Sequence, residues 1–177
     1  MSFQQLQNHG HEFLPIDLQK IITISFVTER NGDIELSSCT DLAPFLDSIR
    51  DADHFVTWNG NRFDVPVLYF RTLLNNLVIN EKIFDEKHHT DLKSLLSNGD
   101  INSISGLDSV SKHLGLPGKS GHTGNAVWNL YLDKKMDEVL IKNKAYEKKI
   151  TEGIILNLID IKKAYKIMKH DLENKGG

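Results

Sequence analysis

The sequence predicts an α/β fold in which a mixed sheet is flanked by helices. An early pair of apolar segments is joined by Asn31-Gly32, a short apolar run follows at residues 54–58, and strand-like and helix-like patterns then alternate. The 177 residues are 40% hydrophobic and 25% charged, which is typical of one globular domain. We therefore expect a single domain over residues 1–177.

The first elements are predicted to form a β-hairpin followed by a helix. Residues 20–28, KIITISFVT, are apolar and β-branched, which indicates a buried strand. Asn31-Gly32 is a strong hairpin signal, and residues 33–36 alternate as a return strand should. Residues 40–50, TDLAPFLDSIR, have apolar positions at helical spacing after a capping residue, Thr40 or Asp41.

The remaining elements follow in alternation. Residues 54–58 form a short apolar run, typical of a second buried strand, and Pro66 fits the first turn of a helix over 67–74. Further helices are expected from Thr90 to Leu96, over 107–114 with Gly115 ending it, and along the amphipathic stretches 126–148 and 154–172. Residues 115–124 are expected to be a glycine-rich loop.

Charge and cysteine content exclude several classes of protein. The formal net charge of −3 shows no basic balance, so nucleic-acid binding would rest on a local patch or on bound metal. The single cysteine, Cys39, excludes an intrachain disulfide framework and a cysteine-rich zinc site. No apolar run reaches the roughly 20 residues of a membrane span, and the N-terminus lacks the apolar core of a secretory signal. We expect a cytoplasmic protein that does not enter the membrane.

Residues 55–68, FVTWNGNRFDVPVL, run from a strand through a polar loop into a helix. Such a loop lies at the carboxyl edge of a sheet, where open α/β sheets bind ligands. Asp64 stands at the helix start and Asn59 stands before it. The Asp64 carboxylate suits a hard divalent cation, but it also suits a helix cap, and the residues alone leave both interpretations open.

The segment NGNRFDVPVL resembles the second motif of the DEDD superfamily of 3′–5′ exonucleases. The nearest group is the predicted exonucleases similar to the proofreading domain of family B DNA polymerases. Four further segments resemble that group in the same order along the chain: FLPIDLQKIITIS (13–25), HTDLKSLL (89–96), SISGLDSVSKHLGLPGK (103–119) and GNAVWNLY (124–131).

The resemblance implies a ribonuclease-H-like fold that removes nucleotides from a single-stranded DNA or RNA 3′ end. In that superfamily four carboxylates hold two divalent metals, Mg²⁺ or Mn²⁺, which activate water and stabilise the leaving oxygen. Asp64 matches the metal carboxylate of the second motif, and Asp160 is the candidate for the third. Asn59 and Phe63 then lie where the substrate strand passes. Lys119 is a candidate phosphate contact by charge, or else part of an ordinary connector, and Asp160 is equally compatible with a solvated helix face.

Two departures from the family pattern lead us to expect impaired hydrolysis. The first motif, Asp-x-Glu, is not found before the hairpin, and Asp33-x-Glu35 lies in the return strand, where we interpret it as coincidence. We therefore expect a domain that is N-terminally incomplete and lacks the first, central strand between the hairpin and the strand at 54–58. Direct pairing of the two neighbouring strands, a partner chain or a missing upstream segment would fill the gap in the sheet.

The second departure is in the third motif, where Leu156 and Ile155 stand in the places usual for Tyr or His. The alternative function is a catalytically inactive remnant that binds nucleic acid or serves a structural role.

Asp91 is expected to cap its helix rather than to support the site. No zinc site is expected, because the histidines lack a paired spacing: His9, His11, His88, His89 and His122.

Overall fold

A computed structural model describes residues 15–113, 115, 130 and 132–150 of the chain. Its elements are η1 (Ile16–Leu18), β1 (Ile24–Arg30), β2 (Asp33–Cys39), α2 (Leu42–Ser48), β3 (Phe55–Thr57), α3 (Asp64–Leu74), η2 (Glu81–Phe84), β4 (His89–Asp91), α4 (Leu92–Leu96), α5 (Leu107–His113) and α7 (Met136–Ile150). The α/β class predicted from the sequence is confirmed. The glycine-rich loop with Lys119 and the helix predicted over 154–172 with Asp160 lie outside the described residues.

The predicted hairpin is present as β1 and β2. The two strands pair antiparallel in a register that runs from Ile24 opposite Cys39 to Arg30 opposite Asp33. Asn31 and Gly32 have φ angles of 56° and 90°, and positive φ at both central residues defines the two-residue turn that matches the twist of a hairpin. The strand begins four residues later than predicted, because residues 20–23 have no ladder partner in the described part of the chain.

The structure contains a second pair of strands, β3 and β4, of which the sequence predicted only β3. β3 pairs with β4 through Phe55–His89, Val56–Thr90 and Thr57–Asp91. We expected a helix from Thr90, but α4 begins at Leu92 and the three residues before it form a fully buried strand. The predicted helix start at Thr90 is therefore wrong, because Thr90 lies in the strand β4 and the helix begins two residues later.

The described strands form two separate two-stranded sheets instead of the single mixed sheet expected. Both sheets nevertheless pack against one apolar core. Phe45 and Leu46 of α2 and the C-cap residue Ile49 belong to it with Val65 of α3. The strands contribute partly buried residues to it (Ile24, Phe26 and Phe55). The edge-to-face contact between Phe26 and Phe45, with ring centroids 5.1 Å apart, fixes α2 against the hairpin.

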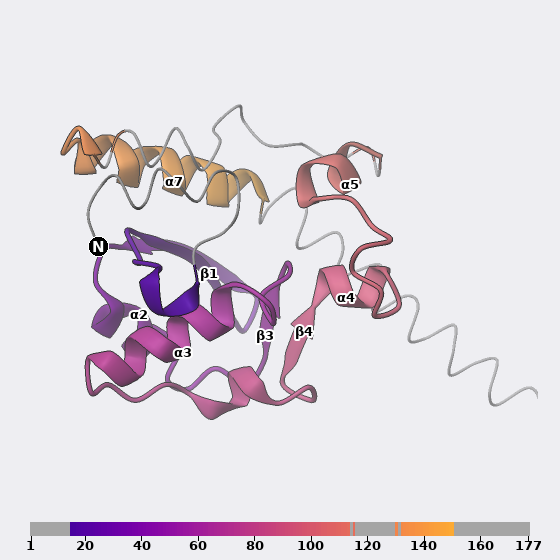
Figure 1. The fold of residues 1–177 in the computed structure, drawn as a ribbon, viewed down its shortest axis with the longest axis horizontal. Coiled ribbons are helices and arrows are strands. Elements are labelled where there is room, and N and C mark those ends of the chain that lie inside the picture. Colours follow the sequence, from indigo (N-terminus) through magenta and orange to yellow (C-terminus); the bar gives the residue numbers. More distant parts are fainter. Residues whose placement is uncertain (1–14, 114, 116–129, 131, 151–177) are drawn as a thin grey trace, which may run out of the picture.

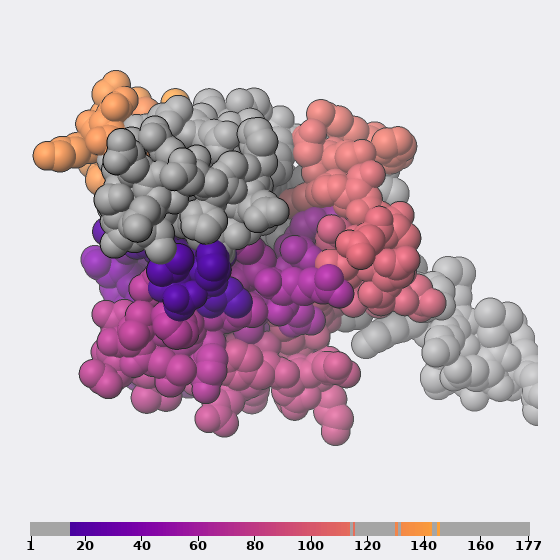
Figure 2. Space-filling model, in the orientation of Figure 1, coloured from indigo at the N-terminus to yellow at the C-terminus, as the bar shows by residue number. Residues whose placement is uncertain are grey.

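The layers are visible in Figure 1. The helix α7 packs on the hairpin, with Val139 completely buried, while α2 and α3 lie on the other side of the hairpin in this view. The segment with α4 and α5 projects to one side of this body, as the space-filling view in Figure 2 also shows. None of the helices in the described ranges is long and apolar enough to cross a membrane.

Candidate functional site

The carboxyl ends of β3 and β4 meet at one edge, because the two strands are parallel and adjacent. The loop that follows β3 carries Asn59 and leads to Asp64, the first residue of α3, and β4 ends at Asp91. We call Asn59, Asp64 and Asp91 the polar edge. It brings together residues that are 32 positions apart in the sequence.

Asp91 is almost completely buried, with 7% of its surface exposed, and its carboxylate accepts four backbone hydrogen bonds. Two of them, from the N–H groups of Lys93 (3.1 Å) and Ser94 (3.4 Å), cap α4. The other two come from Asn59 (2.8 Å) and Asn61 (3.2 Å) in the loop after β3. The predicted cap is confirmed, and the same carboxylate also binds the loop.

The loop itself is held in an uncommon shape. Asn59 has a φ angle of 63°, in the left-handed region that Asn tolerates better than most residues. Gly60 is buried, and a Cβ atom at this position would lie 2.3 Å from Oγ1 and 2.5 Å from Cβ of Thr57. The Gly60 carbonyl accepts hydrogen bonds from the N–H groups of Phe63 (3.2 Å) and Val65 (2.9 Å), which closes the loop onto the start of α3.

Histidine and threonine side chains link β3, and His54 just before it, to the buried strand β4. His89 Nε2 lies 2.8 Å from Thr57 Oγ1, and His54 Nε2 lies 2.8 Å from Thr90 Oγ1. Burial lowers the pKa of His89 below its ordinary value of 6.5, although the nearby Asp91 charge opposes this effect. His89 is therefore a neutral hydrogen-bonding group at neutral pH.

Asp64 is the first residue of α3, and Phe63 is the N-cap, so the cap interpretation of Asp64 is wrong. Partial desolvation of the carboxyl raises its pKa to about 6; the negative charge of Asp91 adds to this, and a hydrogen bond from its own backbone N–H opposes it. The residue as a whole is exposed, so water reaches one side of the group and screens part of this effect. At neutral pH the Asp64 side chain is therefore an ionised carboxylate that is partly desolvated on one side and open to water on the other.

A family model described as a predicted 3′–5′ exonuclease related to the exonuclease domain of PolB matches residues 11–146. The chain belongs to this family. No curated protein and no solved structure gives a match. The resemblance stated above is thus confirmed over most of the chain, and the polar edge lies within the matched residues of this predicted exonuclease.

Members of this exonuclease family generally use divalent metals, and few oxygen ligands are free for a metal among the described residues. Asp64 has no partner among them except its own N–H, and the buried Oδ1 atom of Asn59 has no hydrogen-bond partner there either. Both oxygens of Asp91 are already occupied by N–H groups. Within the described ranges no three His, Cys, Asp or Glu residues are grouped to hold a metal ion. One carboxylate and one amide oxygen are too few ligands for two metals, so these residues do not fit a two-metal site by themselves.

The structure brings Asn59, Phe63 and Asp64 to the same edge, and Phe63 keeps 37% of its surface exposed beside Asp64. Reasoning from the sequence missed the loop-binding role of Asp91 and the contact between His89 and Thr57. A carboxylate can accept about four hydrogen bonds, whereas capping a helix uses only one or two of them. The spare capacity of Asp91 was the one signal in the sequence that could have indicated further partners.

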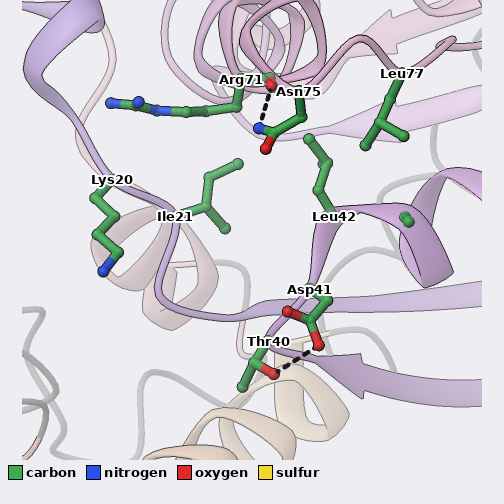
Figure 3. A pocket seen from close by; sticks show the side chains of 9 residues that line it. Lys20, Ile21, Thr40, Asp41, Leu42, Arg71, Asn75 and Leu77 are labelled. Carbon is green, nitrogen blue, oxygen red and sulfur yellow. Dashed lines mark hydrogen bonds between the residues drawn. The ribbon is translucent and has the colours of Figure 1, made fainter.

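A cavity of about 390 Å³ lies at the other end of α3 (Figure 3). Polar side chains of Lys20, Asp41, Arg71 and Asn75 line it together with apolar ones such as Ile21. Arg71 is seven residues along α3 from Asp64, which corresponds to about 10 Å of helix. The cavity is therefore separate from the polar edge.

Proposed function

We propose that this chain is a 3′–5′ exonuclease-like domain that acts on single-stranded DNA or RNA ends in the cytoplasm. The observation that carries the proposal is the position of Asp64, within the matched family segment, at the start of α3 and near enough to Asp91 at the end of β4 for the two charges to interact. The reaction is hydrolysis of the terminal phosphodiester, in which water attacks phosphorus and the ribose or deoxyribose oxygen leaves. Asp64 and Asp160 are the proposed catalytic and metal carboxylates, with Mg²⁺ or Mn²⁺ as the cofactor.

The substrate strand is proposed to pass over the loop after β3. The Asn59 amide oxygen is a buried acceptor without a protein partner in the described residues, so a bound water molecule can donate to it and relay a hydrogen bond to the sugar of the substrate. The partly exposed ring of Phe63 can stack on a base, an interaction that tolerates any sequence. Lys119 is the proposed phosphate contact.

We further propose that an additional strand completes a ribonuclease-H-like sheet. Among the described strands, β1 and β3 each have one paired edge only, and both contribute residues to the same core. An unpaired backbone edge costs hydrogen bonds unless a partner or water satisfies it. A strand from a partner chain or from an upstream segment would supply that pairing.

The second candidate function is binding of nucleic acid, or a structural role, without turnover. The observation that favours it is the small number of metal ligands, because the described part of the polar edge offers one available carboxylate, Asp64. For the same reason we propose that hydrolysis by residues 1–177 alone is slow.

The test is digestion of a 3′-labelled single-stranded oligonucleotide in Mn²⁺ at pH 8, where Asp64 is ionised. We expect slow, EDTA-sensitive release of label that Asp64→Asn abolishes. The matched control Asp100→Asn changes an acidic residue of an exposed turn and should behave as the wild type. Retained binding without digestion would favour the second function, and fast digestion that survives Asp64→Asn would refute the role of Asp64.

A further inference from the structure

We propose that Asp91 is a positioning residue, which holds the loop after β3 and thereby places Asp64. The proposal rests on the proposed function for its consequence in metal binding, but its structural part stands on hydrogen bonds within the described residues. Asp91 lies at the end of β4, whereas the loop that it binds comes directly after β3.

The hydrogen bonds of Asp91 argue against a ligand role and for a positioning role. Oδ1 accepts from the N–H groups of Asn59, Lys93 and Ser94, and Oδ2 accepts from that of Asn61. A carboxylate has about four lone-pair positions, so four N–H donors use its capacity. The side chain is also buried at 7% exposure, which directs it toward the protein and away from a substrate strand.

The hydrogen bonds continue from Asp91 to Asp64 in two steps. Gly60 stands between the two amides that Asp91 holds, so the direction of its carbonyl is fixed on both sides. That carbonyl accepts from the N–H groups of Phe63 and Val65, the two neighbours of Asp64. A change at Asp91 must therefore reach the backbone on both sides of Asp64.

A second contact between the same strands supports this arrangement. Thr57, the last residue of β3, is held by His89 through a 2.8 Å hydrogen bond, and the Gly60 backbone lies directly against the Thr57 side chain. The loop is thus fixed at its start by His89 and along its length by Asp91. Both residues come from β4, a buried strand of three residues.

The test separates the two roles of Asp91 with the variant Asp91→Ser. Serine is a good N-cap and can bind the N–H groups of Lys93 and Ser94, but it is too short to reach Asn59 and Asn61 as well. Asp91→Asn keeps the size and one acceptor oxygen, so it should lose the contact of one oxygen only. Asp100→Ser is the matched control, because Asp100 binds a single N–H, that of Asn102, in an exposed turn.

The first measurement is amide hydrogen exchange of the whole chain by NMR. In Asp91→Ser we expect exchange at Asn59, Asn61 and Val65 to be about tenfold faster, with little change at Lys93 and Ser94. Unchanged exchange at these three amides in the folded variant would overturn the proposal. Should Asp91→Ser fail to fold, Asp91→Asn decides the question: faster exchange at Asn59 or Asn61 supports the proposal, and wild-type exchange at both refutes it.

The second measurement is a Mn²⁺ titration that follows paramagnetic broadening of the Asp64 and Val65 amide signals. We expect Asp91→Ser to need about tenfold more Mn²⁺ than the wild type or Asp100→Ser. Equal Mn²⁺ requirements in spite of faster exchange would show that Asp91 only stabilises the loop, and would overturn its positioning role. Absence of broadening in the wild type would count against the proposed function instead, and the exchange at Val65 would then decide the positioning role alone.

Discussion

The packing of Gly60 against Thr57 gives a sharp prediction for the variant Gly60→Ala. The new Cβ would lie 2.3 Å from Oγ1 and 2.5 Å from Cβ of Thr57. Rotation of the Thr57 side chain cannot move its own Cβ, so the backbone must shift. Overpacking of this kind costs about 1–3 kcal/mol, and a weakened Thr57–His89 hydrogen bond adds about 1 kcal/mol. We expect the free energy of unfolding to fall by about 2–4 kcal/mol.

Urea denaturation followed by circular dichroism measures this loss. The matched control is Gly106→Ala, because Gly106 also has no positive φ angle and nothing lies within 4 Å of its added Cβ. This control should change the free energy of unfolding by less than about 1 kcal/mol. If both variants unfold at the same urea concentration, the close approach of Gly60 to Thr57 is not a real constraint and the reasoning about the loop fails with it.

Four further predictions concern the buried Leu92, the hydrogen bonds of Asn80 and the titration of Asp64 and His89. Leu92→Ala removes a side chain with 0% exposure and should lower the free energy of unfolding, measured by urea denaturation, by about 2–5 kcal/mol. The control Leu95→Ala changes a side chain with 43% exposure and should lower it by less than about 1 kcal/mol. Equal losses in the two variants would contradict the burial of Leu92 in α4. Asn80→Ala removes the donor to three backbone carbonyls and should cost about 1–3 kcal/mol, and a neutral result would show that water replaces it. The pKa of Asp64 is raised from 3.8 to about 6, so between pH 3.8 and about 6 the folded state binds more protons than the unfolded state. The free energy of unfolding, measured relative to Asp64→Asn, should therefore fall as the pH rises from 3.8 to about 6. The lowered pKa of His89 has the opposite effect, because below pH 6.5 the unfolded state binds more protons and the free energy of unfolding falls as the pH drops. NMR titration of the Asp64 carboxyl and the His89 imidazole measures both pKa values, and an ordinary value for either group would contradict the argument for that group.

The hairpin could be predicted from the sequence because its determinants are local. Asn31 and Gly32 both adopt the positive φ angles that their side chains permit, and the turn then fixes the register of both strands. The same holds for the start of α3, where Pro66 is in the first turn as predicted, although the helix begins at Asp64 rather than at Val67.

β4 could not be predicted in the same way. It has three residues, too few to show an alternating pattern, and its partner β3 lies 34 residues earlier in the register of Phe55 with His89. The capping residue Asp91 correctly indicates a helix nearby, but the helix begins at Leu92 and not at the predicted Thr90. The separate pairing of the two sheets likewise depends on contacts between distant segments that no local pattern records.

Asp64 was identified as a candidate from its residue type and its place after a strand, but its environment was not predictable. Its raised pKa depends on desolvation at the start of α3 and on the charge of Asp91, which only the β3–β4 pairing brings near. The positions of Asp160 and Lys119 relative to this edge stay predictions.

The parallel pairing of β3 with β4 also has a kinetic consequence. A two-residue hairpin turn closes in about 1–10 μs, whereas joining β3 to β4 first requires closure of a chain segment that contains α3 and η2. The contacts of Asp91 with Asn59 and Asn61 span 32 and 30 residues and form only when that closure succeeds. The loop that carries the candidate site is therefore expected to acquire its native shape late in folding, after the hairpin is already in place.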